Sequence, residues 1–338
     1  MLHAGGSEFA TTTEVLDVNA QAWTMLDSRP LDGGSSVMYA SNQIMKAGSA
    51  ADAGLSDPSS ATTYVLDMNA ANPAWVQTAS MAYPRSFLNL TALPDGKVLA
   101  TGGETTKDAS NSANAVMPAE LWDPATRIWT TMASMQTPRL YHSVAVLLPD
   151  GRVTVSGGGS YTGAPDQRTA EIYSPPYLFA GARPAISSAP TSAIPYGTSF
   201  FVGTPDAANV ASVALIAPSA VTHSTNMSLR YMSLSFSQTA GGLLVDAPQN
   251  PNLAPPGYYM LFIVNTNGVP SIAPFVRLPA SQFESTGSVG GVAEPPDAVV
   301  LNAVPESSSR SDHRWAAGAI AAMLVLAAVA SQYAWRRR

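Results

Sequence analysis

The chain contains no cysteine among its 338 residues. This absence excludes a disulfide, a thiolate metal site and a cysteine nucleophile within the chain. Lysine is scarce, and the formal net charge is −6. Because phosphate binding requires a basic patch, we expect no nucleic-acid partner.

Charged residues are also few, at 12%, whereas apolar residues reach 46%. A long disordered region is therefore not expected, because such regions are rich in charge and poor in apolar side chains. The 27 prolines and 25 glycines are spread along the chain. Their distribution is typical of many short strands that are joined by tight turns.

The two ends of the chain differ in their targeting signals. The N-terminus lacks the basic stretch and the apolar run of a secretory signal peptide. Residues 315–335 form a stretch without a charge, and three arginines follow it at 336–338. About 20 apolar residues span a bilayer as a helix, and Trp315, Tyr333 and Trp335 suit its interfaces. We predict one transmembrane helix over 315–335, with a buried core helix or a cleaved sorting tail as alternatives.

The terminal arginines favour a cytoplasmic C-terminus, because positive residues are enriched in cytoplasmic segments. The remainder of the chain is then expected to be membrane-anchored and extracytoplasmic, at a cell surface or in a periplasm. Export without an N-terminal signal conflicts with this location. We therefore expect that residues are missing before Met1.

A repeated pattern runs through the first half of the chain. The segment SMAYPRSFLNLTALPDGKVLATGG from Ser80 matches SMQTPRLYHSVAVLLPDGRVTVSGG from Ser134. Three strands with an apolar-acidic signature each lead to a tryptophan, at Trp23, Trp75 and Trp129. A period near 50 residues with a GG pair and a following tryptophan indicates kelch repeats, each of which forms one four-stranded propeller blade.

The repeats predict about three and a half blades in residues 1–182, beginning at the second strand of a blade. A closed propeller usually holds four to eight blades. Residues 183–279 contain short strands and turn signals that are typical of an immunoglobulin-like sandwich. Residues 280–314 are predicted to be a solvated linker. The predicted fold is therefore all-β, a partial kelch β-propeller followed by an immunoglobulin-like β-sandwich, plus one C-terminal transmembrane helix.

Two positions in the repeat carry unusual residues. Tyr141 and His142 stand where the previous repeat has Phe87 and Leu88. Apolar residues therefore suffice for a blade, whereas imidazole and phenolate are good ligands for copper or iron. The alternative is a hydrogen-bonded histidine at the mouth of the propeller channel. His223 lies in a polar segment between two apolar strands, where a histidine is either a ligand or simply exposed.

Four sequence blocks resemble, in their order and spacing, the C-terminal half of the galactose oxidase and glyoxal oxidase family. They are PRLYHSVAVLLPDGRV, EIYSPPYLF, VTHSTNMSLR and LAPPGYYMLFIVNTNGVPSIA. The resemblance implies a seven-bladed kelch propeller and an immunoglobulin-like domain, one loop of which reaches through the central channel to a single copper ion. It also implies that a carbohydrate, alcohol or aldehyde substrate is oxidised while O2 is reduced to hydrogen peroxide.

The resemblance assigns a role to three residues. Tyr141 becomes the axial copper ligand and catalytic base, and His142 and His223 become the equatorial histidine ligands of Cu2+. In the family, a second tyrosine is joined to a cysteine by a thioether bond and carries a radical. Because the chain has no cysteine, this cofactor cannot form within it, and we expect the chain alone to be inactive.

Three hypotheses follow. The chain is the C-terminal portion of a copper radical oxidase, or a membrane-anchored kelch module that binds glycans or a protein, or a gene fragment without a stable fold of its own. The set of Tyr141, His142 and His223 favours the first hypothesis for a complete protein. The missing cysteine favours the other two for the chain as it stands.

Overall fold

The computed structural model consists of strands and turns with three short 3₁₀ helices, so the predicted all-β class is confirmed for the part that it describes. The helices are η1 (Ser112–Asn114), η2 (Pro176–Phe179) and η3 (Ala207–Asn209). The structure describes residues 2–3, 11–31, 34–49, 57–108, 111–159 and 164–280.

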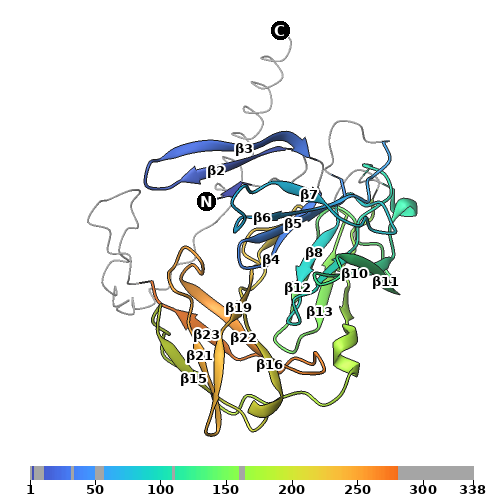
Figure 1. Cartoon of the computed structure of the whole chain (residues 1–338). Helices are drawn as coiled ribbons and strands as arrows, with labels where there is room; N and C mark the ends of the chain where they lie inside the picture. Colours follow the sequence, from blue (N-terminus) through green and yellow to red (C-terminus); the bar gives the residue numbers. More distant parts are fainter. Residues whose placement is uncertain are drawn as a thin grey trace, which may run out of the picture. The chain divides into compact units, whose positions relative to one another are not determined.

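Strands β1 to β14 form four consecutive antiparallel sheets (Figure 1). The first sheet contains β1 (Leu2–His3), β2 (Thr11–Asp17) and β3 (Ala22–Leu31). The second contains β4 (Ser35–Ala40), β5 (Gln43–Ala47), β6 (Thr63–Asp67) and β7 (Trp75–Gln77). The third contains β8 (Asn89–Ala92), β9 (Val98–Thr101), β10 (Pro118–Asp123) and β11 (Ile128–Ser134). The fourth contains β12 (Ser143–Leu147), β13 (Val153–Gly157) and β14 (Ala170–Tyr173).

Each of these sheets corresponds to one kelch repeat. The first strands of successive sheets, β4, β8 and β12, lie next to one another and form the inner edge of the arc. The first sheet begins with β1, which pairs with β2. In the repeat, β1 corresponds to the second strand of the later sheets and β2 to their third strand. The arrangement is consistent with a kelch-like propeller arc that begins at the second strand of a blade.

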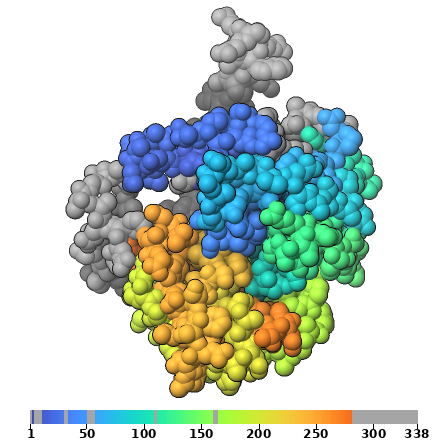
Figure 2. All heavy atoms as spheres, viewed as in Figure 1, coloured from blue at the N-terminus to red at the C-terminus, as the bar shows by residue number. Residues whose placement is uncertain are grey.

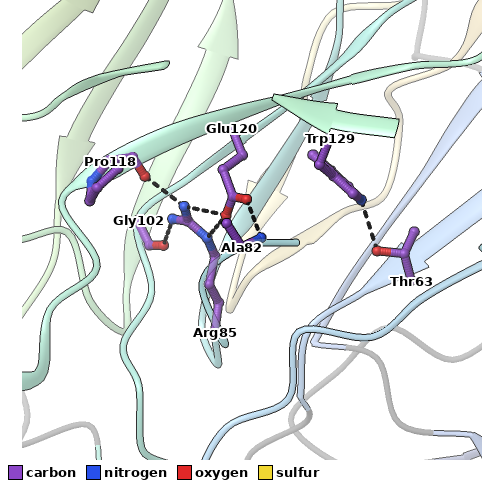
Figure 3. Close-up of polar contacts among 7 residues, drawn as sticks. All are labelled: Thr63, Ala82, Arg85, Gly102, Pro118, Glu120 and Trp129. Atoms are coloured by element: carbon purple, nitrogen blue, oxygen red, sulfur yellow. Dashed lines mark hydrogen bonds and ion pairs between the residues drawn. The ribbon is translucent and has the colours of Figure 1, made fainter. Parts of the chain in front are cut away.

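A tryptophan contact connects neighbouring sheets. The indole Nε1 of Trp75 on β7 donates to Thr13 Oγ1 on β2 at 2.8 Å. One repeat later, Trp129 Nε1 on β11 donates to Thr63 Oγ1 on β6 at 3.0 Å (Figure 3). Trp75 and Trp129 thus each reach the third strand of the preceding sheet, which explains why the sequence repeats a tryptophan at these two positions.

The Pro-Arg pairs of the repeat have a structural role within a blade. Arg85 Nη1 donates to the carbonyl of Gly102 at 2.8 Å, and its Nη2 donates to Glu120 Oε2 at 2.8 Å (Figure 3). Both side chains are fully buried. In the next repeat Arg139 donates to the carbonyl of Gly157 at 3.0 Å and pairs with Glu171 at 3.4 Å. The arginine, which lies before the first strand, therefore connects the end of the second strand to the third strand of its blade.

The remaining strands form a two-sheet sandwich and a small hairpin. One sheet contains β15 (Ser199–Gly203), β21 (Gly242–Asp246) and β20 (Phe236–Thr239). The other contains β19 (Tyr231–Leu234), β16 (Val210–Ile216), β22 (Gly257–Asn265) and β23 (Phe275–Leu278). The hairpin contains β17 (Val221–Thr222) and β18 (Thr225–Asn226). Buried aliphatic and aromatic residues of both sheets form a core between them.

In the third and fourth sheets, the turn between the first and second strands contacts the sandwich. Gly96 lies beside the Tyr231 ring, so that even a Cβ there would touch it. Ala273 N–H donates to the carbonyl of Pro149 at 2.8 Å. In the space-filling view the yellow-to-orange sandwich abuts the blue-to-green propeller sheets (Figure 2). The sandwich therefore covers the side of the third and fourth sheets on which these turns lie.

Two predictions concern residues that the structure does not describe. The linker over 280–314 lies outside the described residues apart from residue 280, and the transmembrane helix over 315–335 lies wholly outside them. No helix within the described part of the chain is long and apolar enough to cross a membrane. The domain limits 1–182 and 183–279 stay predictions.

Candidate functional site

Tyr141 and His142 lie directly before β12, at the end of the blade where β13 finishes in glycines. His142 has a left-handed backbone, with φ at 63°. Its Nδ1 lies 3.0 Å from the carbonyl oxygen of Gly159. A Cβ at Gly159 would lie 2.6 Å from the carbonyl of Pro165. Only glycine therefore allows the chain to bring this carbonyl to the imidazole.

His223 is supplied by the β17–β18 hairpin. Thr222 pairs with Thr225, so His223 and Ser224 form a two-residue turn, with φ at 50° and 64°. Such a turn normally holds Asn or Gly, because both residues need a positive φ. The His223 Nδ1 lies 2.6 Å from Thr222 Oγ1. The hairpin lies against the inner strands β4, β8 and β12, so it brings a histidine of the sandwich to the inner edge of the arc.

The structure brings the three predicted residues together. The ring centroids of Tyr141 and His142 are 3.9 Å apart, and those of Tyr141 and His223 are 5.6 Å apart. The two imidazole centroids are 5.1 Å apart. Residues from the fourth sheet and from the sandwich hairpin thus form one cluster of a phenol and two imidazoles.

The donor atoms of this cluster fit a copper ion. A carbonyl oxygen can only accept, so in the neutral imidazole of His142 the hydrogen lies on Nδ1 and the lone pair on Nε2. Histidines that bind metals commonly engage their other ring nitrogen in this way. Imidazole and phenolate nitrogen and oxygen atoms suit copper. Within the described ranges there is no cluster of three or more His, Cys, Asp or Glu residues that could hold a metal.

Two residues of the preceding repeat carry no strong sequence signal, and the first of them contacts the cluster. The buried Phe87 ring lies 5.0 Å from the Tyr141 ring, at an interplanar angle of 60°. Glu104 is fully buried, and neither carboxyl oxygen has a hydrogen-bond partner among the described residues. Burial raises the pKa of Glu104 to about 8, and the charge of Asp108 raises it further. Glu104 could have been identified from its position directly after the GG pair, where the next repeat has Gly159.

His3, the remaining histidine of the described residues, has a different environment. It is exposed on β1, in register with Glu14. It is absent from the ring contacts that join Tyr141, His142 and His223.

The fold and the cluster define a class of protein: kelch-type blades followed by a sandwich whose hairpin adds a histidine to the inner end of the blades. The family model of the glyoxal oxidase N-terminus matches residues 33–177. The galactose oxidase-like early set domain matches residues 183–278. These residues therefore belong to the galactose oxidase and glyoxal oxidase family, and the resemblance predicted from the sequence is confirmed.

Individual relatives support the same assignment. The chain is 33% identical over 242 residues to the aldehyde oxidase GLOX1 of Arabidopsis thaliana, covering 63% of this chain and 38% of that protein. It is 30% identical over 204 residues to a galactose oxidase of Gibberella zeae, covering 58% of this chain and 30% of that enzyme. The chain thus spans well under half the length of these curated relatives.

A solved structure extends the likeness to three dimensions. A fungal alcohol oxidase of the AA5 family, determined in complex with copper, superposes with a TM-score of 0.72 at 29% identity. The match covers 82% of this chain and 60% of that chain. The blades and the sandwich therefore share their arrangement with an oxidase that was solved with copper.

Proposed function

We propose that this chain supplies the metal-binding half of a copper radical oxidase. The complete enzyme would oxidise a primary alcohol, including one on a carbohydrate, or an aldehyde, and would reduce O2 to hydrogen peroxide. The observation that carries the proposal is the cluster of Tyr141, His142 and His223, whose ring centroids lie 3.9–5.6 Å apart. The family assignment supports it.

Each residue of the cluster has a distinct part in this proposal. His142 is oriented by its Nδ1–H bond to the carbonyl of Gly159 and presents Nε2 to the metal. His223 is held in a hairpin turn and presents a second imidazole. Copper, when bound, supplies one-electron redox chemistry at this position. Tyr141 is the group that would take the hydroxyl proton of an alcohol substrate, as a general base in contact with it.

The chain alone is proposed to be inactive. The family's radical cofactor needs a cysteine that is bonded to a tyrosine, and the chain has no cysteine. A copper ion without this second redox centre exchanges one electron, whereas the oxidation of an alcohol to an aldehyde requires two. Anchoring in a membrane through residues 315–335, with the β-domains outside the cytoplasm, is a further proposal that rests on the sequence.

One alternative function is favoured by the same missing cysteine. The chain could act as a kelch module that binds glycans or a protein and keeps the metal cluster without oxidase chemistry. The two functions differ in their dependence on a cysteine-containing partner segment. Peroxide production that is restored by adding such a segment would support the oxidase and contradict the module.

Calorimetric titration of residues 1–280 with Cu(II) tests the proposed site. We expect one copper ion per chain and strong weakening in His142→Ala and in His223→Ala. His3→Ala is the matched control and should bind like the unchanged chain, because His3 lies outside the cluster. Equal copper uptake by the His142→Ala/His223→Ala double variant would rule the site out.

A further inference from the structure

In the part of the chain that the structure describes, two residues in ring contact with Tyr141 have a left-handed backbone outside a strand-hairpin turn. Among the described residues, the non-glycine residues with positive φ fall into two groups. Gln21, Asn42, Arg127, His223 and Ser224 lie in the turns of strand hairpins, where such angles are common. The others are Phe87 and His142.

Phe87 is the residue of the second group that the proposed function leaves unexplained. Its φ is 55°, a conformation that bulky side chains rarely adopt, and its side chain is 6% exposed. Backbone strain of this kind persists only where the surroundings enforce it, and it gathers at functional sites. The strain at Phe87 therefore calls for a reason beyond packing.

The surroundings do enforce the conformation. Ser86 N–H donates to the carbonyl of Glu104 at 3.0 Å, and Glu104 N–H donates back to the carbonyl of Ser86 at 3.1 Å. A Cβ at Gly103 would lie 2.4 Å from Ser86 O and 3.3 Å from Leu88 N. The glycine and the two hydrogen bonds together fix the peptide units on both sides of Phe87.

This backbone aims the Phe87 ring at Tyr141. The rings meet edge to face at 5.0 Å, an arrangement that aromatic pairs prefer. The ring of His142 lies against Tyr141 as well, at 3.9 Å. A phenyl ring has no hydrogen-bonding atom. Phe87 therefore acts on the phenol of Tyr141 by fixing the orientation of the phenol and by limiting the access of water to it.

We infer that Phe87 is a positioning residue for Tyr141: its ring, held by a left-handed backbone, fixes the orientation in which the phenol faces the proposed copper site. This inference rests on the proposed function. Phe87 comes from the third sheet and Tyr141 from the fourth, so the contact also ties the geometry of the site to the packing of two neighbouring blades.

The test compares Phe87→Leu, Phe87→Gly and Phe87→Tyr in copper-loaded residues 1–280. Leucine keeps the apolar volume without the ring, and glycine adopts the positive φ without strain. Both should retain copper through the two histidines but lose the phenolate-to-copper charge-transfer absorption and change the Cu(II) electron paramagnetic resonance spectrum. Phe87→Tyr keeps an aromatic ring and should retain both signals. The absorption that it retains must vanish in Phe87→Tyr/Tyr141→Phe, which assigns this absorption to Tyr141.

Phe200→Leu is the matched control, because Phe200 is a buried phenylalanine of the sandwich core. It should lower stability and leave both spectra unchanged. Unchanged spectra in Phe87→Leu and Phe87→Gly would overturn the inference while leaving the proposed copper site intact.

A second readout does not depend on copper, so a chain that binds no copper would contradict the proposed function alone. In tyrosine-labelled, metal-free protein, the Tyr141 ring resonances are identified by their loss in Tyr141→Phe. We expect them to broaden or to move to averaged positions in Phe87→Gly and to stay in place in Phe200→Leu. Sharp, unmoved Tyr141 resonances in Phe87→Gly would overturn the inference.

Discussion

Glu104 is buried without a hydrogen-bond partner among the described residues, and its ionisation is coupled to folding. Burial, with help from Asp108, raises its pKa from 4.5 to about 8. Between these values the folded chain holds a proton that the unfolded chain has lost. Stability that is present below pH 4.5 is therefore lost as the pH rises toward 8.

Replacement of Glu104 by glutamine should flatten this pH dependence. The folded chain is expected to lose up to about 1.4 kcal/mol per pH unit between pH 5 and 8, and Glu104→Gln should remove most of that slope. Urea unfolding at several pH values measures it. The control is Glu171→Gln, since hydrogen bonds lower the pKa of Glu171 despite its burial; it should shift stability by a constant amount over this range. Equal slopes in the wild type and Glu104→Gln would refute the prediction.

The residues of the site differ in how far the sequence predicts them. Tyr141 and His142 could be identified because a neighbouring repeat shows what an ordinary blade has at those positions. Phe87 could not, because an apolar residue in a β-rich segment indicates only burial. Its left-handed backbone depends on contacts with Gly103 and Glu104, which lie a full hairpin away in the chain.

At the scale of the elements, the third and fourth sheets each contain an arginine–glutamate ion pair, and the two pairs differ in their burial. Arg85 and Glu120 are both fully buried, whereas Glu171, the partner of Arg139, is 25% exposed. Removing one partner from a buried pair leaves an uncompensated charge, which costs about 3–5 kcal/mol. Where the removed partner is partly exposed, water can take its place beside the remaining charge, so the loss of stability is smaller.

Glu120→Gln should therefore destabilise the chain more than Glu171→Gln does. We expect a loss that approaches about 3 kcal/mol for Glu120→Gln, and clearly less for Glu171→Gln. Chemical unfolding at pH 7 measures both. A larger loss in Glu171→Gln would mean that burial does not govern the strength of this repeated contact.

The β17–β18 hairpin shows where sequence reasoning stops. The sequence predicts only a polar segment between two apolar strands around His223, because two-residue strands are too short to give an alternating pattern. Its place beside β4, β8 and β12 depends on how the sandwich packs against the blades. The kelch strands, by contrast, follow from the PDG turns, the GG pairs and the spaced tryptophans.

The turn of this hairpin carries strain that one substitution can relieve. Ser224 has a φ of 64°, which costs an L-residue about 1–2 kcal/mol relative to a right-handed conformation. Ser224→Gly should raise the stability of the chain by up to about 1 kcal/mol, part of the gain being offset by the greater freedom of glycine when unfolded. Thermal unfolding measures the change, and copper titration serves as the control because His223 is retained. A lower Tm would show that the Ser224 side chain outweighs the strain.

At the scale of the whole molecule, the blades and the sandwich share one hydrophobic core. The cluster that contains Leu90 and Leu99 of the third sheet also contains Tyr231, Met260 and Phe262 of the sandwich. A second cluster belongs to the sandwich alone. The sequence predicts the two parts from their separate strand patterns, but the shared core depends on which faces meet, and no pattern along the chain encodes that.

Residues 1–280 should therefore unfold in one transition, because neither part keeps its full core without the other. The sandwich alone, residues 183–279, keeps its own cluster but would expose the Tyr231 face, so we expect it to fold with a lower Tm and to self-associate. Tyr231→Ala should lower the Tm of residues 1–280 and reduce self-association of the isolated sandwich. Differential scanning calorimetry and sedimentation measure these outcomes. Two separate transitions in residues 1–280, with the sandwich melting at the same temperature when isolated, would show that the shared core does not couple the parts.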